Sequence, residues 1–415
     1  MKHLQLILFL MSMIQTASAS NIAQVGKFNL TSTSCNGNPL INNVQVQGNY
    51  LLHNDRMDCM NDSFRVHDIK ANQEVFSYLP QSPYNQSCKA HLTANKHLAV
   101  SCNSSQSNHV QNTVLGPDGK IVFQESLTRN YTTGLQPVSL DNQVYFISHQ
   151  HNNRIPFFHR HFLTLTEVNT QNYTSQQNSL RWKYQATTVS PYFLSRPHVS
   201  QVNQLGEVIL FDQNYNITTI SLAQNKLKVE SALKNQRDGH GFSITILHLT
   251  MSQNGSFMGF DSMLGTVSSR GENKFIMIPI NGETENWMSF RRFSKEGEIF
   301  PSTIAMYDDQ TLYGIKESSI VFYQILGDES LAVQGSVELP AELHNRNNIF
   351  SNDSQYHSQS AEVFLHARDE QSLYKISTST GVTKVSTQQP VINLQESYFI
   401  TRDSNQQYSV YQILD

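Results

Sequence analysis

The sequence predicts an all-β protein that is built from a repeated unit of about 50 residues. Three observations support this prediction. Apolar and polar residues alternate along most of the chain, as they do in strands that bury one face. No segment carries the apolar stripe that a helix of three turns would need. One pattern of a turn followed by a strand recurs from Gly48 to Asp403.

Each unit starts with a short polar turn, continues with alternating apolar residues and often ends with a small polar residue or an acid. Examples are GNYLLHND from Gly48 and NKHLAVSC from Asn95. The equivalent positions of the eight units are Tyr50, Leu98, Val144, Val208, Phe257, Leu312, Val363 and Tyr398. They are separated by 48, 46, 64, 49, 55, 51 and 35 residues, with further apolar strands around each unit.

Four strands in every unit of this length are typical of β-propeller blades. Through these units, residues 20–415 resemble the β-propeller superfamily in general, without the signature of a specific family. The resemblance implies a single propeller of about eight four-stranded blades, and the short last gap of 35 residues leaves seven as the alternative. The last unit lacks an outer strand, so we expect the N-terminal strand, around KFNLTS, to complete it and close the ring.

The N-terminus has the order of a signal peptide. Lys2 precedes an apolar run from Leu4 to Ile14, and the small residues Ala17-Ser18-Ala19 follow. The run has about eleven residues, whereas a membrane-spanning helix needs roughly 20. We therefore expect cleavage after Ala19, a secreted or periplasmic location without a membrane span, and one mature domain over residues 20–415.

The composition argues against nucleic-acid binding. Charged residues make up 15% of the chain, with 29 basic and 33 acidic side chains and no basic run longer than Arg291-Arg292. A nucleic-acid-binding surface would require a basic patch. The surface is polar through amide and hydroxyl groups instead, which favours hydrogen-bonded recognition of a protein or a carbohydrate.

All four cysteines lie in the first quarter of the chain. An even number in an exported protein favours disulfides over metal binding. Cys88 and Cys102 are symmetric about Asn95, the centre of a predicted hairpin turn, so they should face each other across the hairpin. That pairing leaves Cys35 to bond with Cys59.

The longest predicted loop between a second and a third strand is SHQHNNRIPFFHRHF, residues 148–162. The propeller resemblance implies that such loops open around the channel mouth, where ligands are usually bound. The candidate ligand-binding residues of this loop are Arg154, Phe157, Phe158 and Arg160. Aromatic and guanidinium groups together suit a sugar, a peptide or an anion.

The same loop contains four histidines, in the pairs His149 with His151 and His159 with His161. Residues two apart lie on one side of an extended chain, so each pair presents two imidazoles to a metal ion. No neighbouring carboxylate or cysteine completes a ligand set, and an ordinary polar loop is the alternative interpretation.

A second cluster, RDGHGF at residues 237–242, enters the fifth unit and contributes Arg237, Asp238 and His240. Arg196 and His198 begin the innermost strand of the preceding unit and should lie near the same mouth. An Asp with a His can support acid–base catalysis, and Arg can hold a carboxylate or sulfate. The alternative is a simple Asp-Gly turn beside ordinary strand ends.

Two functions follow from these patterns. The first is an exported binding module that recognises a protein or carbohydrate through its loop face. The second is a polysaccharide lyase or hydrolase, which requires His198, His240 and Arg237 to converge within about 10 Å in one pocket. The nucleophile elbow, the metalloprotease helix, the P-loop and the dinucleotide fingerprint are all missing, so we expect no cofactor.

Overall fold

The computed structural model confirms the all-β prediction. It describes residues 22–29, 44–57, 61–104, 109–128, 132–152, 160–182, 198–199, 202, 206–211, 216–224, 226–232, 243–251, 257–266, 269–279, 288–291, 303–306, 311–316, 318–326, 330–341, 354–357, 362–366, 372–377, 381–387, 389–395, 398–404 and 407–414. Within these ranges the regular structure is antiparallel sheet, and no helix is long and apolar enough to cross a membrane.

The described strands form eight sheets, which we number along the chain. The first sheet contains β2 (Val44–Gln47), β3 (Tyr50–Met57), β4 (Asn61–Asp68) and β5 (Gln73–Tyr78). The second contains β6 (Gln86–Leu92), β7 (Leu98–Asn103), β8 (Val110–Leu115) and β9 (Ile121–Leu127). The third contains β10 (Thr132–Gly134), β11 (Val138–Leu140), β12 (Gln143–Asn152), β13 (Arg160–Asn169) and β14 (Ser175–Trp182).

The other five sheets have four strands each. The fourth contains β15 (His198–Val199), β16 (Glu207–Phe211), β17 (Asn216–Ser221) and β18 (Lys226–Ala232). The fifth contains β19 (Ser243–Met251), β20 (Phe257–Thr266), β21 (Ser269–Pro279) and β22 (Met288–Arg291). The sixth contains β23 (Thr303–Met306), β24 (Thr311–Lys316), β25 (Ser319–Leu326) and β26 (Ser330–Glu338). The seventh contains β27 (Ser354–His357), β28 (Glu362–His366), β29 (Ser372–Ser377) and β30 (Gly381–Ser386). The last contains β31 (Val391–Gln395), β32 (Tyr398–Arg402), β33 (Gln407–Ile413) and β1 (Ile22–Asn29).

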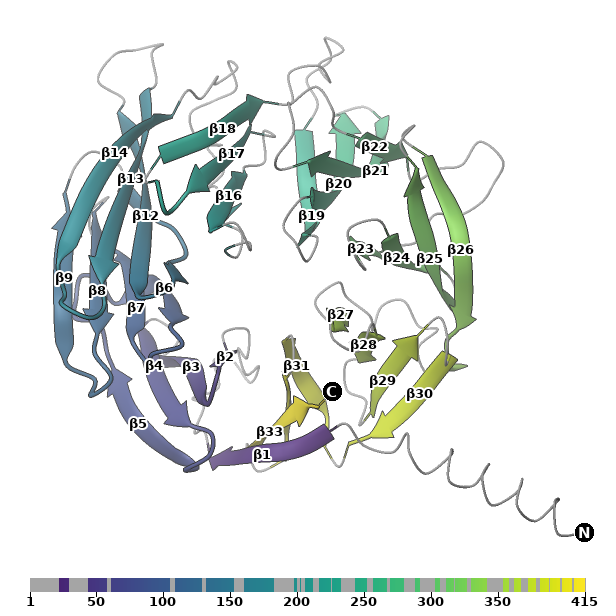
Figure 1. Ribbon diagram of the computed structural model, residues 1–415, viewed down its shortest axis with the longest axis horizontal. Helices are drawn as coiled ribbons and strands as arrows, with labels where there is room; N and C mark the ends of the chain where they lie inside the picture. Colours follow the sequence, from purple (N-terminus) through teal and green to yellow (C-terminus); the bar gives the residue numbers. More distant parts are fainter. Residues whose placement is uncertain are drawn as a thin grey trace, which may run out of the picture.

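The sheets follow one another around a ring in the order of the chain (Figure 1). The eight positions chosen as equivalent in the sequence all lie at the first or second residue of the second strand of a sheet. The predicted repeat is therefore confirmed. Its period is visible in the sequence because the second strand lies between two neighbouring sheets, so both of its faces are apolar.

The core lies between the faces of consecutive sheets. Between the first and second sheets, Phe64 and Val66 pack against Leu98 and Val100, all fully buried. The opposite face of the second sheet packs on the third, where Phe146 belongs to the cluster. The second sheet thus shares its apolar residues with the sheets before and after it, and the pattern of β7, with five buried residues in a row, results from this arrangement.

The N-terminal strand β1 pairs antiparallel with β33, near the other end of the chain (Figure 1). The register runs from Ile22 opposite Ile413 to Asn29 opposite Gln407. Phe28 is 4% exposed and packs in a cluster that joins the last sheet to Leu51 and other residues of the first. This strand therefore contributes both backbone pairing and core packing where the two ends of the chain meet.

Candidate functional site

The predicted loop at residues 148–162 is for the most part a hairpin, which corrects the sequence interpretation. β12 continues to Asn152 and β13 already begins at Arg160, and the last part of β12 also pairs with β10. Backbone pairing needs no apolar side chains, so a polar stretch can continue a strand beyond the core. Residues 153–159, with the candidates Arg154, Phe157 and Phe158, lie outside the described residues.

Three of the four histidines of this hairpin lie on its two strands. His149 is half-buried and lies opposite Leu163, and the backbone of His151 lies opposite that of His161. His159 lies outside the described residues. Among the described residues, no group of three His, Cys, Asp or Glu side chains is placed to hold a metal ion. A metal site formed by the four histidines stays a prediction.

The candidate catalytic cluster is placed only in part. The backbone of His198 pairs with Phe211 at the edge of the fourth sheet. Arg196 and the cluster of Arg237, Asp238 and His240 lie outside the described residues. The convergence that the lyase or hydrolase hypothesis requires stays a prediction.

Sequence reasoning missed a chain of polar side chains that joins three consecutive sheets. The Gln45 side chain makes two hydrogen bonds with the backbone of Leu92. Its Oε1 accepts from the Leu92 amide at 3.0 Å, and its Nε2 donates to the Leu92 carbonyl at 3.4 Å. Its Nε2 lies 3.3 Å from Nδ1 of His91, and Nε2 of His91 lies 2.8 Å from Oγ of Ser139. These residues lie on β2, β6 and β11. β2 and β6 are the first strands of their sheets and lie on the inner side of the ring (Figure 1), and β11 pairs with β12 on the same edge as β10.

Partners in this chain are 46 and 48 residues apart, which is one repeat. The polar residues therefore occupy equivalent places in successive sheets. Burial lowers the pKa of His91 to about 4, so the imidazole is neutral at pH 7 and can donate from one nitrogen while it accepts at the other. A neutral His is the form that such a relay of hydrogen bonds requires.

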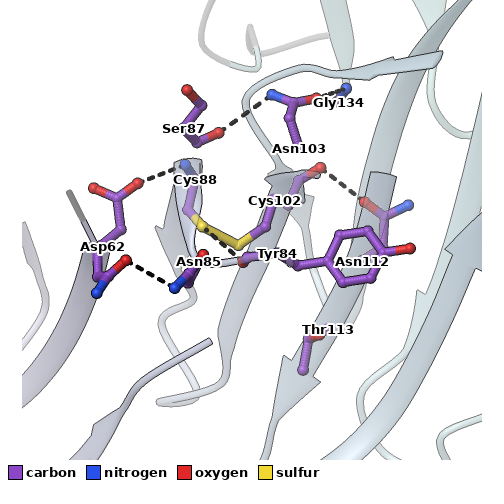
Figure 2. The surroundings of a disulfide bond; sticks show 12 residues. Asp62, Tyr84, Asn85, Ser87, Cys88, Cys102, Asn103, Asn112, Thr113 and Gly134 are labelled. Carbon is purple, nitrogen blue, oxygen red and sulfur yellow. Dashed lines mark hydrogen bonds between the residues drawn. A yellow bond between two sulfur atoms is a disulfide. The ribbon is translucent and has the colours of Figure 1, made fainter. Parts of the chain in front are cut away.

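The predicted disulfide between Cys88 and Cys102 is confirmed. The two residues are register partners in β6 and β7, as the symmetry about the hairpin turn implied (Figure 2). Asp62 of the first sheet is 1% exposed, and its Oδ2 accepts a 2.7 Å hydrogen bond from the amide of Cys88. Cys35 and Cys59 lie outside the described residues, so their pairing stays a prediction.

On the other side of the disulfide, the Asn103 side chain joins the second and third sheets (Figure 2). Its Nδ2 donates to the carbonyl of Ser87 at 3.2 Å, and its Oδ1 accepts from the amide of Gly134 at 3.0 Å. A Cβ on Gly134 would clash with Oγ of Ser101, so a larger residue there would require the Ser101 side chain to move. The first three sheets are thus held together by polar contacts on both sides of a covalent bond.

Removing this disulfide is expected to lower the free energy of unfolding by about 3 kcal/mol. The bond closes a short loop, with a sequence separation of 14, and a loop of this size is worth roughly that amount of chain entropy in the unfolded state. Urea denaturation of a Cys88→Ser/Cys102→Ser variant measures the loss. The unsubstituted protein with its disulfides intact is the reference, and an unchanged urea midpoint in the variant would contradict the prediction.

Four rings meet between the last and first sheets. The Phe28 and His67 ring centroids are 5.2 Å apart, and those of His53 and Tyr408 are 6.2 Å apart. The exposed fractions of His53, His67 and Tyr408 are 4%, 5% and 1%. Nδ1 of His53, Nε2 of His67 and the Tyr408 hydroxyl have no hydrogen-bond partner among the described residues. This interface therefore contains buried polar groups that are poorly satisfied.

Burial, together with the smaller effects of His67 and Arg65, lowers the pKa of His53 to about 4. The pKa of His67 is also lowered, mainly by burial, against the opposing effect of the Glu74 carboxylate. Both imidazoles are neutral at pH 7, because the loss of hydration on burial outweighs any nearby charge that would favour the protonated ring.

A cavity of about 350 Å³ opens beside these rings, between β1 and the turn that joins β4 to β5. Its lining is mostly polar and consists of Lys27, Phe28, His67, Asn72, Gln73, Glu74 and Gln407. Nothing in the sequence indicated this cavity, because its walls come from opposite ends of the chain. Only the pairing of β1 with β33 brings them together.

No protein-family model matches the sequence, and the comparison with curated proteins gives no match either. Solved structures do match. They include the β-propeller domain of Cps50 (Swd1) from Myceliophteria thermophila, at 8% identity over 94% of this chain and 99% of that chain with a TM-score of 0.43. The arrangement of antiparallel sheets in Figure 1 is of the β-propeller type. The matched structures include several β-propeller proteins, and they assign the chain to no specific family.

Two other propellers illustrate the range of these matches. Quinohemoprotein alcohol dehydrogenase from Comamonas testosteroni is 8% identical over 96% of this chain and 77% of that chain, with a TM-score of 0.47. Virginiamycin B lyase from Staphylococcus aureus is 11% identical over 80% of this chain and 94% of that chain, with a TM-score of 0.37. At these identities the likeness concerns the fold alone.

Proposed function

We propose that this chain is an exported binding module: an eight-bladed propeller over residues 20–415 whose ring is closed by β1, released by cleavage after Ala19. Eight sheets with one repeated register support the blade count, and the pairing of β1 with β33 supports the closure. The disulfide between Cys88 and Cys102 supports an oxidising compartment outside the cytoplasm.

The module recognises a protein or a carbohydrate through the tip of the hairpin formed by β12 and β13. The observation that carries this proposal is the length of the hairpin. β12 has ten residues and β7 of the second sheet has six. Counted from the equivalent positions Val144 and Leu98, β12 continues three residues further, which extends the hairpin by about 10 Å at ~3.3 Å per residue.

The segment of the sequence between β12 and β13 contains Arg154, Phe157 and Phe158, and Arg160 begins β13. This combination of residue types is suited to a sugar ring or an acidic peptide. The hairpin of β20 and β21 in the fifth sheet has a similar length and could form a second wall of the same surface. A rigid framework that presents such side chains supports binding, because little conformational entropy is lost when the ligand docks.

Glycan arrays and a panel of extracellular proteins, probed with the purified mature chain, test this function. The variant Arg154→Ala/Phe157→Ala/Phe158→Ala/Arg160→Ala is expected to lose at least about tenfold in affinity for any ligand found, equivalent to about 1.4 kcal/mol. The matched control is Lys120→Ala/Ile121→Ser, which removes an exposed cation and an exposed apolar residue from the second sheet.

Equal affinity of the tip variant and the control would overturn the proposed surface. Turnover of a polysaccharide by the pure protein would favour the lyase or hydrolase instead. In that case variants of His198, His240 and Arg237 are the next to be assayed.

A further inference from the structure

We propose that the cavity between β1 and the β4–β5 turn binds a small carboxylate that also carries hydroxyl groups, such as a uronic acid or an open-chain hydroxy acid. The site lies where the last sheet meets the first, on other strands than the hairpin of the proposed binding surface. It therefore goes beyond that function and does not depend on it.

The charge balance of the cavity favours an anion. Glu74 lies 3.9 Å from the guanidinium of Arg65, so its negative charge is partly compensated. Lys27 lines the cavity and is exposed, and its ammonium group makes no ion pair with any residue in the described part of the chain. The Lys27 ammonium group therefore has no counter-ion within ion-pair distance in the described part of the chain, and a ligand carboxylate would supply one.

The buried imidazole of His67 points to the same chemistry. Its Nε2 has no hydrogen-bond partner among the described residues, although the side chain is 5% exposed and lines the cavity. The ring is held in place against Phe28. Burial keeps the pKa of His67 low, so the ring is neutral and can present an N–H to a carboxylate oxygen. A bound acid would satisfy a polar atom that is otherwise unpaired.

The amides around the cavity suit hydroxyl groups. Oδ1 of Asn72 accepts a 3.0 Å hydrogen bond from the amide of Lys27, which fixes the orientation of the side chain and leaves its Nδ2 as a donor. Gln73 adds an amide group to the lining, and the carboxylate of Glu74 can accept from a hydroxyl. These two groups and the Nδ2 of Asn72 suit the hydroxyl groups of the ligand better than an acid group alone.

Isothermal titration calorimetry and ligand-observed NMR on the mature protein test the proposal. The probes are D-glucuronate and D-galacturonate for uronic acids, gluconate and tartrate for hydroxy acids, D-glucose as the neutral control and sulfate as an anion without hydroxyls. We expect saturable binding of at least one organic acid, about tenfold tighter than glucose and sulfate. The group of acids that binds identifies the source of the ligand.

The variant Lys27→Gln is expected to weaken acid binding about tenfold, because it removes the unmatched charge. The matched control is Lys70→Gln, which removes an exposed lysine of the β4–β5 turn that is not among the lining residues of the cavity. A second readout is the NMR titration of His67, whose pKa should rise when a carboxylate binds beside it.

Three results would each overturn the proposal. The first is the absence of saturable binding by every organic acid. The second is glucose or sulfate binding as tightly as the acids. The third is an unchanged affinity in Lys27→Gln. Because the hairpin tip is tested with other variants, failure here is distinct from failure of the proposed binding surface.

Discussion

Lowering the pH from 7 to 4 is expected to reduce the free energy of unfolding by on the order of 5 kcal/mol through two buried histidines. The pKa of His53 and that of His91 are each lowered from 6.5 to about 4, in both cases mainly by burial. In the unfolded chain both imidazoles regain the ordinary value near 6.5.

The direction of this pH effect follows from the number of protons that the folded and unfolded states bind. Between about pH 6.5 and pH 4 the unfolded chain takes up protons that the folded protein does not bind. The free energy of unfolding therefore falls as the pH falls through this window, and above about pH 6.5 neither histidine contributes to its pH dependence. The two histidines lie in different interfaces: His53 is between the last and first sheets, and His91 joins the first three.

Chemical denaturation at pH 7, 6, 5 and 4 measures the effect. The variant His91→Gln keeps an amide that can bond Gln45 and Ser139, and His53→Phe keeps a ring beside Tyr408. Each variant should remove about half of the pH dependence, because each deletes one of two groups with similar pKa values. If both variants lose stability between pH 7 and pH 4 as steeply as the unsubstituted protein, other titratable groups cause the pH dependence.

The repeat was predictable because its strands are buried on both faces. Leu98, Val100 and Cys102 face the first sheet, whereas Ala99 belongs to the cluster shared with the third. Such a strand is a short continuous apolar run, and eight of them at similar spacing are visible without an alignment. The Cys88–Cys102 bond was predictable for a related reason, since hairpin register depends only on the position of the turn.

The polar contacts between sheets were not predictable in the same way. Gln45, His91 and Ser139 occupy successive repeats, but they are three different residue types, so no self-similarity marks them. Their partners are set by the packing of neighbouring sheets and not by local sequence. The hairpin at residues 148–162 was interpreted as a loop for the converse reason, because its polar composition hides backbone pairing.

The cavity beside His67 depends on contacts between the two ends of the chain. Lys27 and Gln407 reach the β4–β5 turn only because β1 pairs with β33 and packs on the first sheet. Sequence reasoning predicted that the N-terminal strand would complete the last sheet, but it had no basis for the side chains that this pairing would bring together.

A chain that begins at residue 30, without β1, is expected to lose its cooperative unfolding or to associate through β33. Seven register pairs join β1 to β33, and Phe28 is buried in the interface with the first sheet. Loss of a buried Phe alone costs about 3–5 kcal/mol, and whole domains are stable by only about 5–15 kcal/mol. The exposed edge of β33 would also offer a template for pairing with a second chain.

Light scattering after size exclusion and urea denaturation compare this chain with one that begins at Ile22. A synthetic peptide of residues 20–30 should restore the monomer and its unfolding transition, because the strand can pair with the vacant edge from solution. The same peptide with Phe28→Ala should bind at least about tenfold more weakly, since it keeps the backbone pairing and loses the buried ring. This comparison separates the contribution of the buried Phe28 ring from that of the backbone hydrogen bonds between β1 and β33.

The proposed ring closure makes this test decisive. If β1 closes the ring, its loss disturbs the last and first sheets together, so hydrogen exchange should increase in both β33 and β4. If the shortened chain stays monomeric with an unchanged urea midpoint, the two ends are held together without β1. The Phe28 side of the cavity would then be dispensable for folding, and Lys27 could be removed from the proposed acid site without structural cost.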